Sequence, residues 1–205
     1  MKREEFFTTW SRSHGGAEIS GIVKAWLNIS YIIVKPLMKI RITPNSLTLL
    51  GLFFGVALYL NAKSIWAPVL LVLSLTCDGV DGTLAIVSGK SSKWGAVLDS
   101  LVDRITEVFW VLALYKIGAD LYLLIVVAVF ALLQEYLRAR AAGLGLAQVG
   151  IVTFAERPVR ASFIFVSLIA WQIKMPIINQ ITLLWLLLQV VSFMMVSRFT
   201  YQHLN

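Results

Sequence analysis

Cysteine is nearly absent from this chain of 205 residues, which contains Cys77 and no other. A single thiol excludes an intrachain disulfide and any metal site built from several cysteines. Next to Asp78, Cys77 is expected to be a small residue at a helix contact. The sequence also has no visible internal repeat. Its polar first residues contain no hydrophobic signal segment, so we expect no cleaved leader.

Charged residues are scarce as well, and this excludes an ordinary soluble domain. Charged types make up 14% of the sequence and hydrophobic types 59%, with a mean hydropathy of +0.81. Apolar stretches of about 17–25 residues are long enough to cross a bilayer as helices. The fold class predicted is all-α, an integral membrane bundle of six transmembrane helices near residues 46–62, 65–87, 94–117, 120–141, 159–174 and 177–197.

The first part of the chain is more polar than the rest. Residues 19–42 place apolar side chains near helical spacing with lysine and arginine between them, which predicts an N-terminal interfacial amphipathic helix. Pro36 is expected to break that helix. We therefore divide the chain into residues 1–42, a cytoplasmic N-terminus with the amphipathic helix, and residues 43–205, the six-helix domain.

Lysine and arginine are distributed unevenly around the predicted spans. Fourteen of the eighteen lie before Pro44, around the loops after the second and fourth spans, or near the C-terminus. The other three loops have one each. Because cytoplasmic loops are enriched in these residues, we expect a multi-pass protein of the cell membrane with both termini in the cytoplasm.

Four aspartates interrupt the second and third predicted spans: Asp78, Asp81, Asp99 and Asp103. Helical spacing puts the first two on one face with Gly82 and Ala85, and the last two on one face with Gly95. An ionised carboxylate inside a bilayer is costly unless it is neutralised, and like charges this close are stable only around cations. Oxygen ligands suit hard divalent ions such as Mg²⁺, so the pattern predicts a metal site that opens toward the cytoplasm.

Two other interpretations compete with a metal site. The aspartates could cap helices or form salt bridges, but only Arg104 is near enough in sequence to pair with them. They could also form the ion or proton relay of a transporter, since acids inside membranes often mark ion pathways. Residue spacing alone does not exclude the relay.

The same residues form a recognisable signature. The run Asp78-x-x-Asp81-Gly82-x-x-Ala85, nine residues, then Gly95-x-x-x-Asp99-x-x-x-Asp103 resembles the motif of the CDP-alcohol phosphotransferases. The segment Thr43-Pro44-Asn45-Ser-Leu-Thr48 resembles the start of the family's conserved region. One position departs: the family has arginine directly after the alanine, and this chain has Ile86.

The resemblance implies an enzyme that transfers a substituted phosphate from a CDP-linked donor, such as CDP-diacylglycerol, to an acceptor hydroxyl, with release of CMP. It implies two Mg²⁺ or Mn²⁺ ions held chiefly by Asp78, Asp81 and Asp99, with Asp103 as general base and further ligand. The donor-binding residues that it implies are Asn45, Thr48, Asp81, Gly82, Ala85 and Gly95. It also implies the bilayer as environment, no nucleic-acid partner and a homodimer.

Four arginines at the predicted cytoplasmic ends of helices form a second candidate site, for an acceptor phosphate: Arg138, Arg140, Arg157 and Arg198. Guanidinium groups bind phosphate through paired hydrogen bonds, although helix ends also carry arginine simply to anchor them. The runs Tyr136-Leu-Arg138-Ala-Arg140 and Glu156-Arg157-Pro158-x-Arg160 resemble the branch that makes phosphatidylinositol phosphate or its archaeal counterpart.

The sequence therefore predicts a membrane enzyme of phospholipid synthesis whose acceptor is inositol phosphate. Three alternatives remain: glycerol phosphate as the acceptor of the same chemistry, a transporter, and a catalytically silent relative, which Ile86 suggests.

Overall fold

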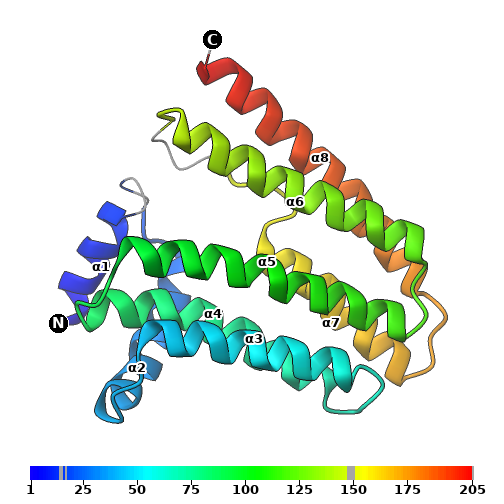
Figure 1. Ribbon diagram of the computed structural model, residues 1–205, viewed down its shortest axis with the longest axis horizontal. Helices are drawn as coiled ribbons and strands as arrows, with labels where there is room; N and C mark the ends of the chain where they lie inside the picture. The colour runs from blue at the N-terminus through cyan, green and yellow to red at the C-terminus, as the bar shows by residue number, and fades with distance from the viewer. Residues whose placement is uncertain (14–15, 17, 147–150, 205) are drawn as a thin grey trace. The chain divides into compact units, whose positions relative to one another are not determined.

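The computed structural model describes residues 1–13, 16, 18–146 and 151–204, and within them it contains helices and no strands (Figure 1). The eight helices of the described residues are α1 (Arg3–Ser13), α2 (Gly21–Lys39), α3 (Pro44–Leu60), α4 (Ala67–Val87), α5 (Lys93–Lys116), α6 (Leu121–Gly143), α7 (Arg157–Gln172) and α8 (Ile178–Leu204). The all-α prediction is confirmed, and α3 to α8 coincide with the six hydrophobic stretches.

Fewer than the six predicted helices are long and apolar enough to count as candidate membrane spans. Among the described residues, α4, α6 and α8 are long and apolar enough to cross a bilayer. The helical segment Val23–Lys39 and α3 would form a fourth span if they are taken together, although the chain bends by 109° between them. α3 and α7 have 17 and 16 residues, and a span needs about 20. α5 is long enough but carries the charged groups of the motif. The chain is a multi-pass membrane protein, but the count of six spans is not confirmed.

Contacts divide the chain into two compact units. The first comprises Met1–Phe54 and Val72–Thr106, and the second comprises Gly55–Leu71 and Glu107–Asn205. The division passes through α3, α4 and α5, and each unit is described by itself below. The predicted domain boundary after residue 42 stays a prediction.

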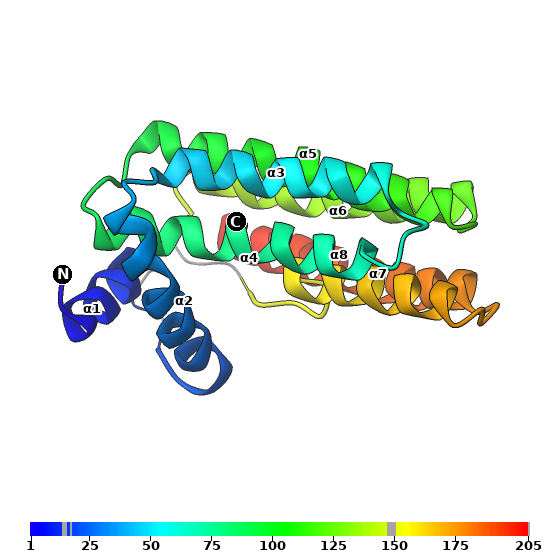
Figure 2. The same cartoon turned by 90° about the horizontal axis from the view of Figure 1, so that it is seen from below.

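In the first unit, α1 packs against α2 (Figure 2). Phe6 is fully buried and stacks on Tyr31, with ring centroids 5.6 Å apart, and the Tyr31 hydroxyl donates a hydrogen bond to the Met1 carbonyl. We did not predict α1. Its signal was present in the sequence, because Glu4 and Glu5 at its start and Arg12 at its end complement the helix dipole.

The prediction that Pro36 breaks α2 is wrong: the helix continues through Pro36 to Lys39. Proline removes one N–H bond and crowds the carbonyl four residues earlier. Only three helical residues follow Pro36, so a distortion there affects just the last turn of α2. The Ile40 N–H still reaches the Pro36 carbonyl at 3.3 Å, and the chain then turns at Arg41, whose φ is 60°. α2 leaves Ile29 and Ile32 exposed, which suits the predicted position against lipid.

The approach of α3 to α4 depends on Gly51. A Cβ at this position would lie 3.3 Å from the Ser74 carbonyl oxygen and 3.4 Å from Cys77 Cβ. The Ser74 hydroxyl donates a hydrogen bond of 2.8 Å to the Gly51 carbonyl, a polar contact typical of helix pairs in membranes. Cys77 is buried in the core of this unit, as expected for a packing residue.

In the second unit, α6 and α8 run side by side (Figure 1). At their centre the fully buried amides of Gln134 and Gln189 form a hydrogen bond of 2.8 Å. The Ser192 hydroxyl of α8 accepts the Ala155 N–H at 2.9 Å, which ties the segment before α7 to this pair. Polar contacts of this kind hold helices together where lipid removes the hydrophobic driving force.

The contact at Gly51 gives a stability prediction. Gly51→Leu should lower the free energy of unfolding by about 1–3 kcal/mol, because the added side chain overpacks the α3–α4 contact. The measurement is the melting temperature of the purified protein in detergent. Gly143→Leu is the control, since a Cβ there meets nothing within 4 Å. Equal melting temperatures of the two variants would contradict the role of Gly51.

Candidate active site

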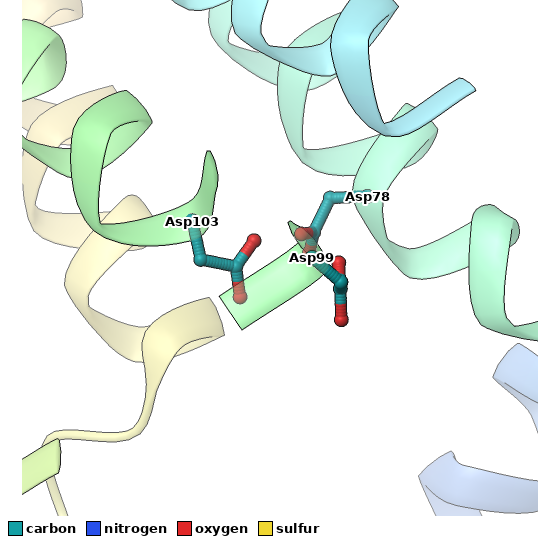
Figure 3. Close-up of side chains that lie close together, drawn as sticks. All are labelled: Asp78, Asp99 and Asp103. Atoms are coloured by element: carbon teal, nitrogen blue, oxygen red, sulfur yellow. The ribbon is translucent and has the colours of Figure 1, made fainter. Parts of the chain in front are cut away.

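Three aspartates of the first unit lie together. Asp78 comes from α4, and Asp99 and Asp103 come from successive turns of α5 (Figure 3). Each offers one carboxylate oxygen, and these three atoms lie within 4.8 Å of one another. We call these residues the aspartate triad. The side chains are half-buried, and the arrangement follows from helical spacing on α5 and from the position of α4 beside it.

Asp81 lies one turn beyond Asp78 but outside the aspartate triad. It is 5% exposed and accepts a hydrogen bond from the Thr48 hydroxyl of α3. A buried carboxylate with a donor of this kind is held in one orientation. The four predicted carboxylates are therefore arranged as three plus one, and the assignment of Asp81 as a metal ligand stays a prediction.

A cavity of about 220 Å³ adjoins the aspartate triad, since Asp99 belongs to both. All six predicted donor-binding residues line it: Asn45, Thr48, Asp81, Gly82, Ala85 and Gly95. The other residues around it are Ser13, Pro44, Ile86, Lys90, Ser91, Ser92 and Ala96. The structure thus brings together the residues that the motif selected, although their roles remain a proposal.

The first turns of two helices border this cavity. At the start of α3, the Ser46 N–H donates to the Thr43 hydroxyl at 3.2 Å. At the start of α5, the Gly95 N–H donates to the Ser92 hydroxyl at 2.9 Å. Helix N-termini carry partial positive charge, so both favour an anion in the cavity.

The two glycines of the motif serve different purposes. A Cβ at Gly82 would meet no protein atom within 4 Å, so this position faces open space. A Cβ at Gly95 would lie 2.9 Å from Ser92 Oγ and 3.3 Å from Asn45 Oδ1. Gly95 therefore lets the starts of α3 and α5 approach each other, whereas Gly82 leaves room for a ligand.

Ion pairs in the second unit involve two of the four predicted arginines. Arg138 donates to both carboxylate oxygens of Glu156, at 2.9 and 2.6 Å. Arg157 lies 3.7 Å from Glu107, and its guanidinium sits over the Trp110 ring at 5.3 Å from the centroid. Arg140 and Arg198 are exposed.

A further arginine, Arg160, connects these pairs. It is 2% exposed and contacts Glu107 at 3.5 Å and Glu135 at 2.9 Å, and Glu135 lies 3.7 Å from Arg138. We call this set of three arginines and three glutamates the ion-pair network. Sequence reasoning did not assign its glutamates or Arg160 to a site. One signal was available, because Glu135 stands three residues before Arg138 on a helix.

The pKa of Glu156 reflects its place in the ion-pair network. Burial would raise this pKa, but hydrogen bonds from Arg138 and Thr153 outweigh burial and hold the pKa below its ordinary value. Glu156 therefore stays ionised at neutral pH and keeps Arg138 in place.

A family model described as CDP-alcohol phosphatidyltransferase matches residues 41–202. The chain belongs to this family. Curated relatives include the phosphatidylinositol phosphate synthase of Cutibacterium acnes, 32% identical over 72% of this chain and 74% of that protein. The archaetidylinositol phosphate synthase of Pyrococcus horikoshii is 31% identical over 74% of this chain and 82% of that protein. The phosphatidylinositol phosphate synthase of Corynebacterium glutamicum is 46% identical, but over only 37% of this chain and 36% of that protein.

Solved structures agree on the fold. A crystal structure of Mycobacterium tuberculosis phosphatidylinositol phosphate synthase with CDP-DAG bound superposes with a TM-score of 0.69 at 23% identity, covering 85% of this chain and 94% of that one. A second structure of that protein, in complex with manganese and citrate, covers 84% and 88%. The family predicted from the aspartate motif is confirmed, and with it the class of reaction, phosphatidyl transfer from a CDP-alcohol.

The aspartate triad of this CDP-alcohol phosphatidyltransferase fits a divalent cation. Three carboxylate oxygens within 4.8 Å form a hard, anionic donor set of the kind that Mg²⁺ or Mn²⁺ prefers. The open space at Gly82 leaves room for a ligand beside such an ion. The prediction of a divalent-metal cofactor is therefore confirmed, while a second ion stays a prediction.

Substitutions in the aspartate triad should separate metal binding from folding. Asp78→Asn and Asp99→Asn should each abolish the rise in melting temperature that Mn²⁺ causes, whereas Asp103→Asn should reduce this rise without abolishing it. Without metal, their melting temperatures should equal or exceed that of the wild type, because the substitution relieves repulsion between carboxylates.

Asp120→Asn is the control for this experiment, since Asp120 caps α6 through the Leu123 N–H and asparagine caps equally well. A full Mn²⁺ response in all three triad variants would rule out the aspartate triad as a metal site.

The open space at Gly82 gives a prediction about ligand binding. Gly82→Ala should weaken CDP binding in the presence of Mn²⁺ by about 10- to 100-fold, the equivalent of an overpacking cost of 1–3 kcal/mol. Thermal stability should not fall, because the added methyl meets no protein atom. Titration calorimetry and thermal melts together test this, with Gly143→Ala as control. Unchanged CDP affinity would show that the ligand does not approach Gly82.

Proposed function

We propose that this protein transfers the phosphatidyl group of CDP-diacylglycerol to inositol phosphate, forming phosphatidylinositol phosphate and CMP. The observation that carries the proposal is the aspartate triad beside a cavity that Gly82 leaves open and two helix N-termini border. The choice of acceptor rests on the relatives from C. acnes and P. horikoshii, which are a phosphatidylinositol phosphate synthase and an archaetidylinositol phosphate synthase.

In this proposal Asp78, Asp99 and Asp103 hold the divalent cation, and Asp81 is a further ligand oriented by Thr48. When bound, the cation neutralises diphosphate oxygens and stabilises the leaving CMP. The donor's cytidine and phosphates approach the chain closely at its small residues Gly82, Ala85 and Gly95. The other donor-binding residues of the proposal are Asn45 and Thr48. The lipid tails of the donor stay in the bilayer.

Asp103 acts as the general base. The acceptor hydroxyl attacks the donor's β-phosphorus, a new O–P bond forms, and the bond from this phosphorus to the oxygen of CMP breaks. The hydroxyl proton passes to a carboxylate oxygen of Asp103, whose other oxygen remains available to the cation. The Arg104 guanidinium lies 3.7 Å from the Asp103 carboxylate and partly offsets its negative charge.

The acceptor phosphate is bound by the predicted arginines Arg138, Arg140, Arg157 and Arg198. Arg140 and Arg198 are exposed, whereas Arg138 and Arg157 belong to the ion-pair network, which limits how far their guanidinium groups can move. We infer that the network holds Arg138 and Arg157 in place and that the exposed pair adapts to the acceptor. The excess of lysine and arginine around the same loops supports a site that opens to the cytoplasm in the cell membrane.

The test is CMP release by the purified protein with CDP-diacylglycerol, Mg²⁺ and a panel of acceptors. The panel contains inositol phosphate, glycerol phosphate, serine, inositol and phosphatidylglycerol. Inositol phosphate should give the fastest release, with glycerol phosphate next. Asp103→Asn should lower the single-turnover rate by about 10²- to 10⁴-fold, the usual contribution of a general base, while much of the CDP-lipid binding remains.

Two results would contradict the proposal. A preference for an uncharged acceptor would remove the phosphate-binding role of the arginines but leave the aspartate chemistry intact. Metal-dependent ion flux without CMP release would instead support the transporter.

A further inference from the structure

The cavity beside the aspartate triad has an unusual balance of charge. Of the described residues that line it, Asp81 and Asp99 are acidic, and Lys90 is the one basic residue. Ile86, next to Ala85, contributes no charge. A diphosphate is itself an anion, so a basic side chain in this cavity would favour its binding in addition to the cation at the aspartate triad and the two helix N-termini.

The backbone after α4 fixes Lys90 at this place. Gly89 has a φ of +67°, in the left-handed region that glycine adopts readily. The Gly89 N–H bonds to the Ile86 carbonyl at 3.1 Å, and the Lys90 N–H bonds to the Ala85 carbonyl at 2.9 Å. This glycine turn folds the chain back over the last turn of α4, and its two hydrogen bonds hold the Lys90 backbone next to Ala85 and Ile86.

We propose that Lys90 binds the diphosphate of the CDP-linked donor, as the cation that residue 86 does not provide. This inference rests on the proposed function and adds a specific donor-binding residue to it. The Lys90 side chain is exposed, and no ion pair of the described chain occupies its ammonium group. Lysine binds phosphate as a mobile point charge, which suits a residue at the edge of a cavity.

Lys93 provides a matched control. It carries the same charge three residues further along, at the start of α5, and it is exposed but does not line the cavity. If both lysines only contributed to the positive charge of a cytoplasmic loop, their replacement would have equal effects.

The experiment is titration of CDP into the purified protein in detergent with Mn²⁺. Lys90→Gln should weaken CDP binding by about 10- to 100-fold, the effect of losing a charged hydrogen bond, and Lys93→Gln by less than about threefold. Lys90→Arg should bind CDP nearly as the wild type does. Ile86→Arg added to Lys90→Gln should restore most of the affinity, because residue 86 lines the same cavity. Melting temperatures should be unchanged in all lysine variants.

The outcomes separate this inference from the proposed function. Suppose that the wild type releases CMP. If Lys90→Gln then binds CDP as tightly as the wild type, or loses no more affinity than Lys93→Gln does, the inference fails and the proposed function stands. If Ile86→Arg restores nothing to Lys90→Gln, Lys90 does not act as the cation of this cavity. If the wild type neither binds CDP nor releases CMP from CDP-diacylglycerol, both fail together.

Discussion

Repulsion among carboxylates within an apolar bundle is the constraint on which this structure depends. The oxygens of Asp78, Asp99 and Asp103 lie within 4.8 Å of one another in a chain that has 59% hydrophobic residues. Without a cation their mutual repulsion opposes the packing of α4 against α5. In the proposed function a cation bound among these charges would hold the two helices together. Metal binding and the geometry of the aspartate triad would then depend on each other.

Small residues maintain that geometry in two distinct ways. Gly51 and Gly95 allow close contacts between helices, because a Cβ at either position would crowd atoms of the protein. Gly82 has no such neighbour, so helix packing does not require its small size and the position faces open space. A motif glycine is thus not automatically a binding residue. The space around its missing Cβ distinguishes the two roles.

Local patterns explain what the sequence predicted well. Asp99 and Asp103 stand four residues apart, and a helix necessarily places them on one face. Hydropathy located α3 to α8 for a similar reason, since each needs its own apolar stretch. The errors arise where context decides. Pro36 lies near a helix end, where one lost bond matters little, and α1 depends on burial of Phe6 against Tyr31. The count of six spans is not confirmed, because α3 and α7 are short and α5 carries the charges of the motif.

The arginines show why the second site was harder to predict than the aspartate triad. Counting lysine and arginine treats every positive charge as available, yet Arg138, Arg157 and Arg160 meet three glutamates from α5, α6 and the start of α7. Ion pairs between helices leave no periodic signal in a sequence. The ion-pair network is neutral as a whole, so it adds little net attraction for a phosphate. In the proposed function the positive charge that steers an anionic acceptor therefore comes mainly from exposed groups such as Arg140 and Arg198, while the ion-pair network limits the movement of Arg138 and Arg157.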